Sequence, residues 1–127
     1  MIVVDTSALM AIALGEDDAD ACIEVLARDS IVLISAATVA ETLIVADRRN
    51  VGAEVTRLIE ELDFEVVHLT YDSARQVANA YGRWGKGIHV AGLNLGDCFA
   101  YALARQSNCP LLYVGDDFTK TDIDRAQ

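Results

Sequence analysis

The sequence predicts an α/β fold, a three-layer α/β/α sandwich with a central, mainly parallel, four- to five-stranded sheet. Short apolar runs alternate with longer segments of helical periodicity, and strands separated by helices pair in parallel through right-handed crossovers. The composition is that of a globular protein, because 53% of the residues are hydrophobic and 24% are charged. For a chain of 127 residues we expect one domain, at positions 1–127.

The N-terminal segments predict a strand, two helices and a second strand. The apolar run "IVV" at 2–4 predicts a buried strand, and the helical run at 6–14 ends at Gly15. Positions 17–29 place apolar residues on one face and acids on the other, which is typical of a surface helix. The run "IVLI" at 31–34 predicts the second strand.

The middle of the chain continues this alternation. Ser35 is a suitable N-cap for a helix at 36–49, and a second amphipathic helix is expected at 52–62. The run "FEVVHL" at 64–69 predicts the third strand, and another helix is expected at 71–83.

The C-terminal third begins with a segment that lacks periodicity. "GRWGKGIHVAGLN" holds four glycines, so we expect a loop there. A helix is expected to begin near Asn94, because apolar residues recur at helical spacing after it. "LLYV" at 111–114 predicts the fourth strand, and a short helix is expected near Thr119.

The formal net charge of −10 restricts the possible functions. General coating of nucleic acids depends on Lys and Arg contacts to phosphate, so it is disfavoured for this chain. The charge permits an enzyme that binds phosphate through a cation, and it favours a basic protein partner. No apolar run reaches the roughly 20 residues that span a bilayer, and no leader pattern is present. We therefore expect a cytoplasmic protein.

The cysteines and histidines do not indicate a metal or disulfide site. Cys22, Cys98 and Cys109 are odd in number and far apart, so we expect neither a disulfide framework nor a CxxC site. His68 and His89 have no metal-ligand spacing to each other or to a cysteine, which disfavours zinc. Cys22 and Cys98 fall on apolar helix faces, where ordinary buried thiols are expected.

Acidic residues are placed near the predicted carboxyl ends of the strands. Asp5 follows the first strand, Glu41 lies in the helix after the second, Asp97 lies in the first turn of a helix, and Asp116 and Asp117 follow the fourth strand. In parallel sheets these ends meet at one edge, where ligands bind. Carboxylates gathered there repel one another, and a hard cation such as Mg²⁺ or Mn²⁺ resolves that conflict. Such a site is suited to phosphodiester hydrolysis.

Each acid also has a structural explanation when it is taken alone. Asp5 can cap the following helix, Asp97 can complete a capping box, and Asp116 and Asp117 can be turn residues. Glu41 has the weakest alternative, because its helix is apolar on nearly every face. The joint placement of the acids at one edge is what favours a site.

Polar neighbours of these acids fit both interpretations. Thr6 or Ser7 can hydrogen-bond a metal-bound carboxylate. Asn94 can cap its helix, orient Asp97, or do both. Trp84, in the glycine-rich segment, can stack on a base, anchor a partner or pack in the core.

Four segments of the chain resemble a PIN domain, and more narrowly the VapC toxins of bacterial and archaeal toxin–antitoxin modules. They are "MIVVDTSAL", "SAATVAETL", "YGRWGKGIHVAGLNLGDCFAYALA" and "PLLYVGDDFTKTDI", in that order along nearly the whole chain. The resemblance implies a PIN-like fold. It also implies a Mg²⁺-dependent endoribonuclease that hydrolyses RNA phosphodiester bonds as the toxin of a type II toxin–antitoxin pair.

The resemblance assigns roles to the acids. Asp5, Glu41 and Asp97 match the first, second and third catalytic acids of the family, with magnesium chiefly on Asp5 and Asp97. Glu41 would bind the metal directly or through water, or help to deprotonate the nucleophile. Asp117 is the preferred fourth acid and metal ligand, and Asp116 is the alternative.

The resemblance further implies a homodimer and a small cognate antitoxin whose basic residues enter the acidic cleft. Operator DNA would be reached only indirectly, through the antitoxin, and we expect no membrane partner. A catalytically degenerate PIN-like protein-binding module is the alternative function, although the complete set of acids argues against it. A phosphotransfer domain is disfavoured, because neither Lys86 nor Lys120 follows a strand as that chemistry requires.

Overall fold

The sheet at the centre of the molecule is parallel throughout. The computed structural model describes residues 1–127, and its four strands have the order β3-β2-β1-β4. The strands are β1 (Ile2–Val4), β2 (Val32–Ser35), β3 (Glu65–Val67) and β4 (Leu111–Leu112). All of their pairings are parallel, and helices lie on both faces. This confirms the predicted α/β/α class.

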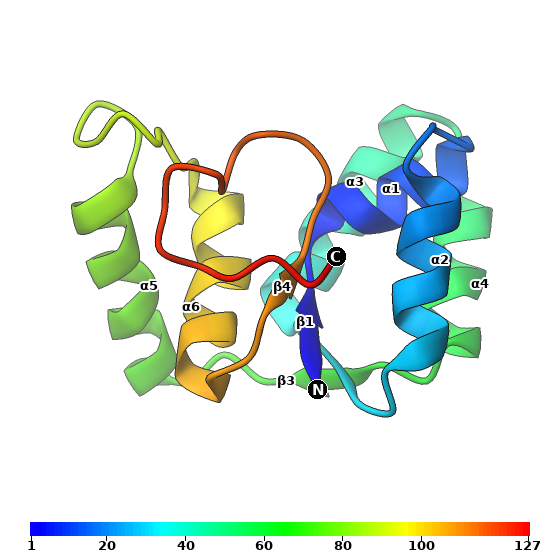
Figure 1. Cartoon of the computed structure of the whole chain (residues 1–127), viewed down its shortest axis with the longest axis horizontal. Coiled ribbons are helices and arrows are strands. Elements are labelled where there is room, and N and C mark those ends of the chain that lie inside the picture. Colours follow the sequence, from blue (N-terminus) through cyan, green and yellow to red (C-terminus); the bar gives the residue numbers. More distant parts are fainter.

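The two faces of the sheet are covered by different helices (Figure 1). α5 and α6 lie on one side, and α1, α2 and α4 lie on the other. The helices are α1 (Thr6–Leu14), α2 (Ala19–Arg28), α3 (Ala36–Arg48), α4 (Gly52–Glu61), α5 (Tyr71–Trp84) and α6 (Leu95–Ser107). None of them has the length and apolar character that crossing a membrane requires.

Alternate residues of β1 belong to opposite layers. Val3 packs in a hydrophobic cluster with residues of α5 and α6, including Trp84 and Tyr101. Ile2 and Val4 pack in a second cluster with residues of α1 and α2. This alternation follows from the pleat of a strand. It explains why the strand is apolar at every position, since a parallel sheet is buried on both faces.

Local signals in the sequence set the ends of the helices. Gly15 ends α1 in the left-handed conformation, with a φ of 64°. The Ser35 hydroxyl accepts a hydrogen bond from Ala37 N at 3.2 Å and is the N-cap of α3. Cys22 and Cys98 are fully buried and unpaired, as predicted for thiols on apolar helix faces.

The C-terminal tail covers the outer edge of β4. Leu111 N donates to Asp124 O at 2.9 Å, and Ala126 N donates to Leu111 O at 2.9 Å. These bonds add a short parallel bridge beside the four strands. The tail therefore satisfies backbone groups that an exposed edge strand would leave unpaired.

Two predictions for the C-terminal third are wrong in detail. The strand predicted at 111–114 ends after two residues, because Val114 N donates to the Ser7 hydroxyl at 2.9 Å and leaves the ladder. The helix predicted near Thr119 does not form. Thr119 N and Thr119 Oγ1 both donate to Asp116 O, at 3.1 and 2.7 Å, which closes a turn of three-residue spacing instead.

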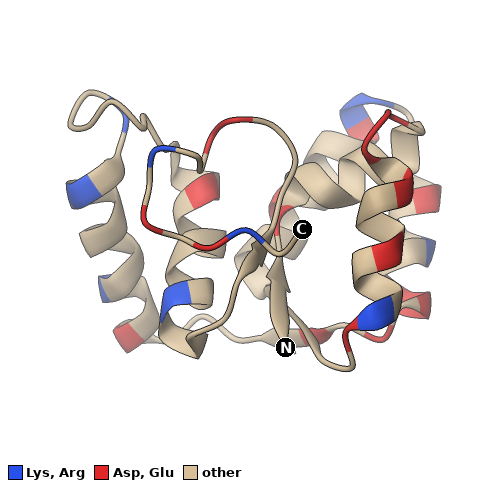
Figure 2. Cartoon of the chain, in the orientation of Figure 1, with Lys and Arg blue, Asp and Glu red and all other residues tan.

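Charge is unevenly divided between the two parts of the chain. Residues 1–69 hold 14 of the 20 acidic residues and 4 of the 10 basic residues, whereas residues 70–127 hold 6 of each. Figure 2 shows acids gathered over α2 and α4, and basic residues on α5, α6 and the C-terminal segment. The net negative charge therefore comes from the part of the chain that contains α1 to α4.

Candidate active site

Asp5 lies where β1 ends and α1 begins, and only 4% of it is exposed. Its Oδ2 accepts hydrogen bonds from Ser7 N at 3.1 Å and from the Ser7 hydroxyl at 2.7 Å. Asp5 is thus the N-cap of α1, the structural alternative considered above. Its Oδ1 forms no hydrogen bond but is not fully enclosed. Capping therefore leaves one carboxylate oxygen available to a ligand.

Asp97 is arranged in the same way at the start of α6, with 9% of it exposed. Its Oδ2 accepts from Asn94 N at 3.0 Å, and Asp97 N donates to Asn94 Oδ1 at 2.8 Å, which completes a capping box. Asp97 Oδ1 forms no hydrogen bond and is also not fully enclosed. Asn94 caps the helix and orients Asp97, so both alternatives given for Asn94 apply.

Glu41 is held by a chain of hydroxyl groups that joins α1 to α3. The Thr6 hydroxyl donates to Glu41 Oε1 at 2.6 Å and lies 2.9 Å from the Thr42 hydroxyl. The Thr42 side chain is fully buried, and its single hydroxyl proton can be donated either to Thr6 Oγ1 or to Thr38 O, which lies 2.7 Å away. Thr6 therefore contacts the second acid, whereas Ser7 contacts the first. Thr42 was not predicted as part of the site, although a hydroxyl residue directly after Glu41 is a signal that the sequence offers.

Gly96 allows Glu41 to approach the start of α6. A Cβ atom at Gly96 would overlap the Glu41 carboxylate, so only glycine leaves the required space. Glycine is unfavourable in a helix. Its presence next to Asp97 in the first turn is therefore a sequence signal for the close approach of another side chain, and it was not predicted as part of the site. The close approach places the second and third acids on facing helices.

The charges of these acids influence one another. Burial raises the pKa of Asp5 to about 6; hydrogen bonds from Ser7 lower it, and the charge of Glu41 adds to the rise. The pKa of Asp97 is raised to about 7, mainly by burial; the charges of Asp5, Asp117 and Glu41 contribute to this rise, and the hydrogen bond from Asn94 N opposes it. Asp97 therefore lies within electrostatic reach of three other predicted acids.

Asp116 and Asp117 lie in the exposed turn after β4. The backbone carbonyl of Asp116 accepts the hydrogen bonds from Thr119 that close this turn. Phe118, which directly follows Asp117, is buried and anchors the segment. Asp117 acts on the pKa of Asp97, and Asp116 is not among the charges that do. This difference favours Asp117, and its role as fourth acid stays a prediction.

The acids suit a divalent cation by their chemistry. Asp5, Glu41, Asp97 and Asp117 all offer carboxylate oxygens as metal ligands. None of these four side chains forms an ion pair with Lys or Arg. Their mutual repulsion is therefore left without a compensating positive charge. No three of the side chains are close enough together to share one ion, so a cation would have to draw them closer. The donor set fits Mg²⁺ or Mn²⁺, which prefer carboxylate oxygen.

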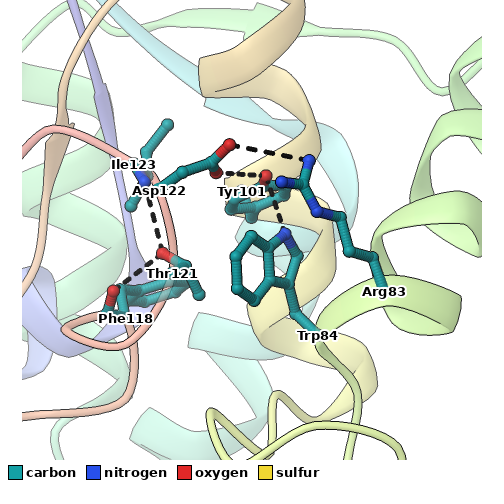
Figure 3. A network of polar contacts seen from close by, with 7 residues as sticks. All are labelled: Arg83, Trp84, Tyr101, Phe118, Thr121, Asp122 and Ile123. Carbon is teal, nitrogen blue, oxygen red and sulfur yellow. Dashed lines mark hydrogen bonds and ion pairs between the residues drawn. The ribbon is translucent and has the colours of Figure 1, made fainter.

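Trp84 is a packed side chain with 8% of it exposed. Its Nε1 donates to the Tyr101 hydroxyl at 2.9 Å, and the Arg83 guanidinium lies 4.6 Å from the centre of its ring (Figure 3). The His89 ring meets it edge-on, with 4.7 Å between the ring centroids. Of the three alternatives for Trp84, packing in the core is therefore the one that the structure supports.

The fold and these acids define the class of protein, and comparison with known sequences agrees. The sequence matches the PIN domain over residues 2–124. It is 43% identical to the VapC ribonuclease Mb0625 of Mycobacterium bovis and to ribonuclease VapC28 of Mycobacterium tuberculosis, over 98% of this chain and 97% of each relative. Ribonuclease VapC of Mycolicibacterium smegmatis is 42% identical over 96% of this chain and 97% of that relative. The chain therefore belongs to the PIN-domain family and, within it, to the VapC ribonucleases.

Solved structures share the fold at low sequence identity. VapC20 of Mycobacterium tuberculosis, a toxin that cleaves the sarcin–ricin loop, has a TM-score of 0.79 at 19% identity and covers 97% of this chain and 96% of its own. A toxin–antitoxin complex from Klebsiella pneumoniae gives a TM-score of 0.72 at 20% identity, over 96% of this chain and 93% of that one. VapBC2 of Rickettsia felis, bound to a promoter DNA fragment, gives a TM-score of 0.71 at 15% identity, over 98% of this chain and 96% of that one.

Proposed function

We propose that this chain is a Mg²⁺-dependent endoribonuclease that acts as the toxin of a type II toxin–antitoxin pair and hydrolyses RNA phosphodiester bonds. Its relatives at 41–43% identity are named ribonucleases, and a structural neighbour is described as cleaving the sarcin–ricin loop. The observation that carries the proposal is the placement of Asp97, a buried carboxyl at the start of α6, next to the glycine against which the Glu41 carboxylate lies. Its pKa is raised by burial and by the charges of three further carboxylates from separate elements. Mn²⁺ is expected to replace Mg²⁺.

In the proposed site, Asp5 and Asp97 hold the cation through the oxygens that their helix caps leave free. The cation, when bound, activates a water molecule and stabilises the leaving oxygen. Ser7 and Asn94 fix the two carboxylates, because each donates to the Oδ2 atom. Hydrogen-bonded partners of this kind orient ligands and tune their basicity.

Glu41 and Asp117 complete the proposed acid set. Thr6 fixes Oε1 of Glu41, so this carboxylate is oriented toward the start of α6. There it can bind the cation, directly or through water, or accept a proton from the nucleophile. Asp117 lies in an exposed turn, where its side chain has room to move toward the cation.

We propose that a cognate antitoxin binds this chain. Structural neighbours include toxin–antitoxin complexes, and the net charge of −10 favours a basic partner segment. Basic residues of the antitoxin would enter the acidic site and compete with the cation. This chain would reach operator DNA only through the antitoxin, and the activity belongs in the cytoplasm, where its RNA substrate lies.

We further propose a homodimer that buries the apolar groove between α3, α5 and α6. One part of the groove, of about 440 Å³, is lined only by apolar side chains, and an adjoining part of about 390 Å³ shares Leu95 and Phe99 with it. Leu95 is 59% exposed and Ile44 is 56% exposed. Large exposed apolar surfaces mark interaction sites. Two copies with a net charge of −10 each repel one another least at a surface with few acids, and Glu41, at the edge next to the acidic site, is the one acid in the lining of this groove.

The dimer proposal can be tested by sedimentation equilibrium. Leu95→Glu should convert the dimer to a monomer, because it places a charge in the buried groove. Ile23, which is 48% exposed on α2 and does not line either part of the groove, supplies the matched control Ile23→Glu, which should remain dimeric. A monomeric parent protein, or a dimer unaffected by Leu95→Glu, would contradict the proposal.

The nuclease proposal is tested with purified protein, RNA hairpins that include a sarcin–ricin loop, and transfer RNA. We expect cleavage in Mg²⁺ or Mn²⁺ but not in EDTA. Asp97→Asn should abolish the cleavage while the fold, monitored by circular dichroism, is retained. A degenerate binding module would instead bind its antitoxin and cleave none of these RNAs in any metal, and cleavage by Asp97→Asn at the parental rate would refute the assignment of the site.

A further inference from the structure

A pocket of about 180 Å³ lies between α5 and α6, apart from the acidic site. Gln76, Asn79 and Arg83 of α5 line it, together with Arg105 of α6. Its lining includes no acidic residue, although the whole chain carries a net charge of −10. Two guanidinium groups and two amides are hydrogen-bond donors, so the chemistry of this pocket suits an anion.

The two arginines have donors to spare. The Arg105 guanidinium forms no hydrogen bond and no ion pair within the chain. Arg83 forms one ion pair, to Asp122, with 3.6 Å between Nη1 and Oδ2, and its side chain is 63% exposed. An exposed pair of this kind contributes little free energy, so a phosphate can compete for the guanidinium. Planar guanidinium groups match phosphate oxygens in pairs.

Polar contacts join the side chains in the wall of the pocket (Figure 3). The Tyr101 hydroxyl accepts from Trp84 Nε1 at 2.9 Å and donates to Asp122 Oδ1 at 2.6 Å. The Arg83 guanidinium carbon lies 4.6 Å from the centroid of the Trp84 ring, and the same guanidinium forms the ion pair with Asp122. The Trp84 ring holds Arg83 beside the pocket before a ligand binds, and such preorganisation reduces the entropy cost of binding.

The pocket is connected to the acidic site through two segments. Tyr101 follows Asp97 by four residues on α6, so the two lie on the same side of the helix, about 6 Å apart along its axis. Asp122, which contacts Tyr101 and Arg83, lies in the same C-terminal segment as Asp117. A linear polymer bound at the acids can therefore continue along α6 to the pocket.

We propose that this pocket binds a phosphodiester of the RNA substrate, outside the bond that is cleaved; the inference rests on the proposed nuclease function. The RNA backbone is repelled by the part of the chain with 14 acidic and 4 basic residues, and it meets balanced charge on the part with 6 of each. An acidic protein segment would meet the same charges as RNA, and the position of the pocket along α6 from Asp97 is what favours the RNA substrate.

The test uses Trp84, the one tryptophan of the chain, as a reporter in the wall of the pocket. A short RNA is titrated in EDTA, so that it is not cleaved, while the indole N–H resonance is followed by NMR. Arg105→Gln removes the positive charge of one guanidinium and leaves every hydrogen bond and ion pair of Trp84, Tyr101 and Arg83 in place. Arg75→Gln is the matched control, because Arg75 is exposed on α5 but does not line the pocket.

We expect RNA to shift the indole resonance saturably in the parent and in Arg75→Gln. Arg105→Gln should weaken RNA binding by about tenfold and lower the slope of log affinity against log salt by about 0.7, as expected for one lost phosphate contact. Equal affinity and salt slope in Arg105→Gln and Arg75→Gln, or RNA binding without a shift of the Trp84 resonance, would overturn the proposal. So would a loss of antitoxin binding in Arg105→Gln with RNA binding intact.

Cleavage assays in Mg²⁺ separate this inference from the proposed function. With a cleavable RNA, the loss in Arg105→Gln should fall on KM rather than on kcat, because the lost contact is made in the ground state as well. Cleavage with an unaltered KM in Arg105→Gln would refute the pocket and leave the nuclease standing. RNA binding that depends on Arg105, in a protein that never cleaves, would refute the nuclease and leave the pocket as an RNA site.

Discussion

Replacing Asp97 with asparagine should make the metal-free protein more stable at neutral pH while it abolishes the activity. The side chain is 9% exposed, and its pKa is raised to about 7 by burial and by the charges of Asp5, Asp117 and Glu41. Asparagine keeps an oxygen that can accept the hydrogen bond from Asn94 N, so the capping box is retained. The substitution therefore removes a buried negative charge and little else.

The size of the effect follows from proton linkage. The carboxyl titrates near 3.8 in the unfolded chain and near 7 in the folded one, so the folded state binds more protons between these values. Below pH 3.8 the Asp97 carboxyl is protonated in both states and does not destabilise the fold. As the pH rises toward 7, the unfolded state loses this proton first, and the folded state is increasingly destabilised relative to it. Each tenfold change in proton affinity corresponds to about 1.4 kcal/mol, which gives a penalty of about 4 kcal/mol at pH 8 and about 2 kcal/mol at pH 5.5. Coupling to Asp5, whose pKa is about 6, spreads this penalty over both carboxyls.

The assay is urea unfolding in EDTA at pH 8 and pH 5.5, followed by Trp84 fluorescence. Asp97→Asn should raise the free energy of unfolding by up to about 4 kcal/mol at pH 8 and by roughly half as much at pH 5.5. Asp116→Asn is the control, because Asp116 is exposed, and its effect should stay within about 0.5 kcal/mol. A variant no more stable than the parent at pH 8, or a gain that does not change with pH, would refute the reasoning.

Three further predictions concern the groups around the acids. Thr42→Val should lower RNA cleavage about tenfold by releasing Thr6 from Glu41 and should cost about 1 kcal/mol of stability, whereas Thr42→Ser should keep both; equal cleavage by the two variants would contradict the hydroxyl chain. Gly96→Ala should reduce cleavage at least tenfold, because its methyl group displaces the Glu41 carboxylate, and parental kinetics would show that this close approach is dispensable. Mn²⁺ at 100 times its dissociation constant should stabilise the parent by about 2.7 kcal/mol and leave Asp97→Asn unchanged in thermal unfolding, whereas equal shifts in both would indicate binding elsewhere.

Much of the fold could be predicted because its signals are local. Strands buried on both faces read as continuous apolar runs, and caps such as Ser35 and Gly15 mark helix ends within a few residues. The lengths of the strands at the edges could not be predicted, because they depend on distant partners. β4 stops where Val114 N bonds the Ser7 hydroxyl, a contact that nothing near Val114 in the sequence indicates.

The acids of the candidate site could be named from the sequence for a similar reason. In a parallel sheet, residues that follow strands gather at one edge, so topology makes Asp5 a candidate, together with Asp116 and Asp117, and the family resemblance supplies the preference for Asp117. The residues that hold the acids were harder to find. Thr42 matters through a hydroxyl contact to another helix, and Gly96 matters through the space it leaves. Both effects depend on how helices pack against one another, which periodicity does not specify.

The central claim is that Asp5 and Asp97 bind one divalent cation, with Glu41 and Asp117 completing the site. The most direct measurement is anomalous diffraction at the manganese edge from crystals of the full chain soaked in Mn²⁺, with Asp97→Asn crystals treated identically. The claim predicts an anomalous peak within bonding distance of the Asp5 and Asp97 Oδ1 atoms in the parent, and none there in the variant. An empty site in well-ordered parent crystals, or a peak that persists in the variant, would contradict it.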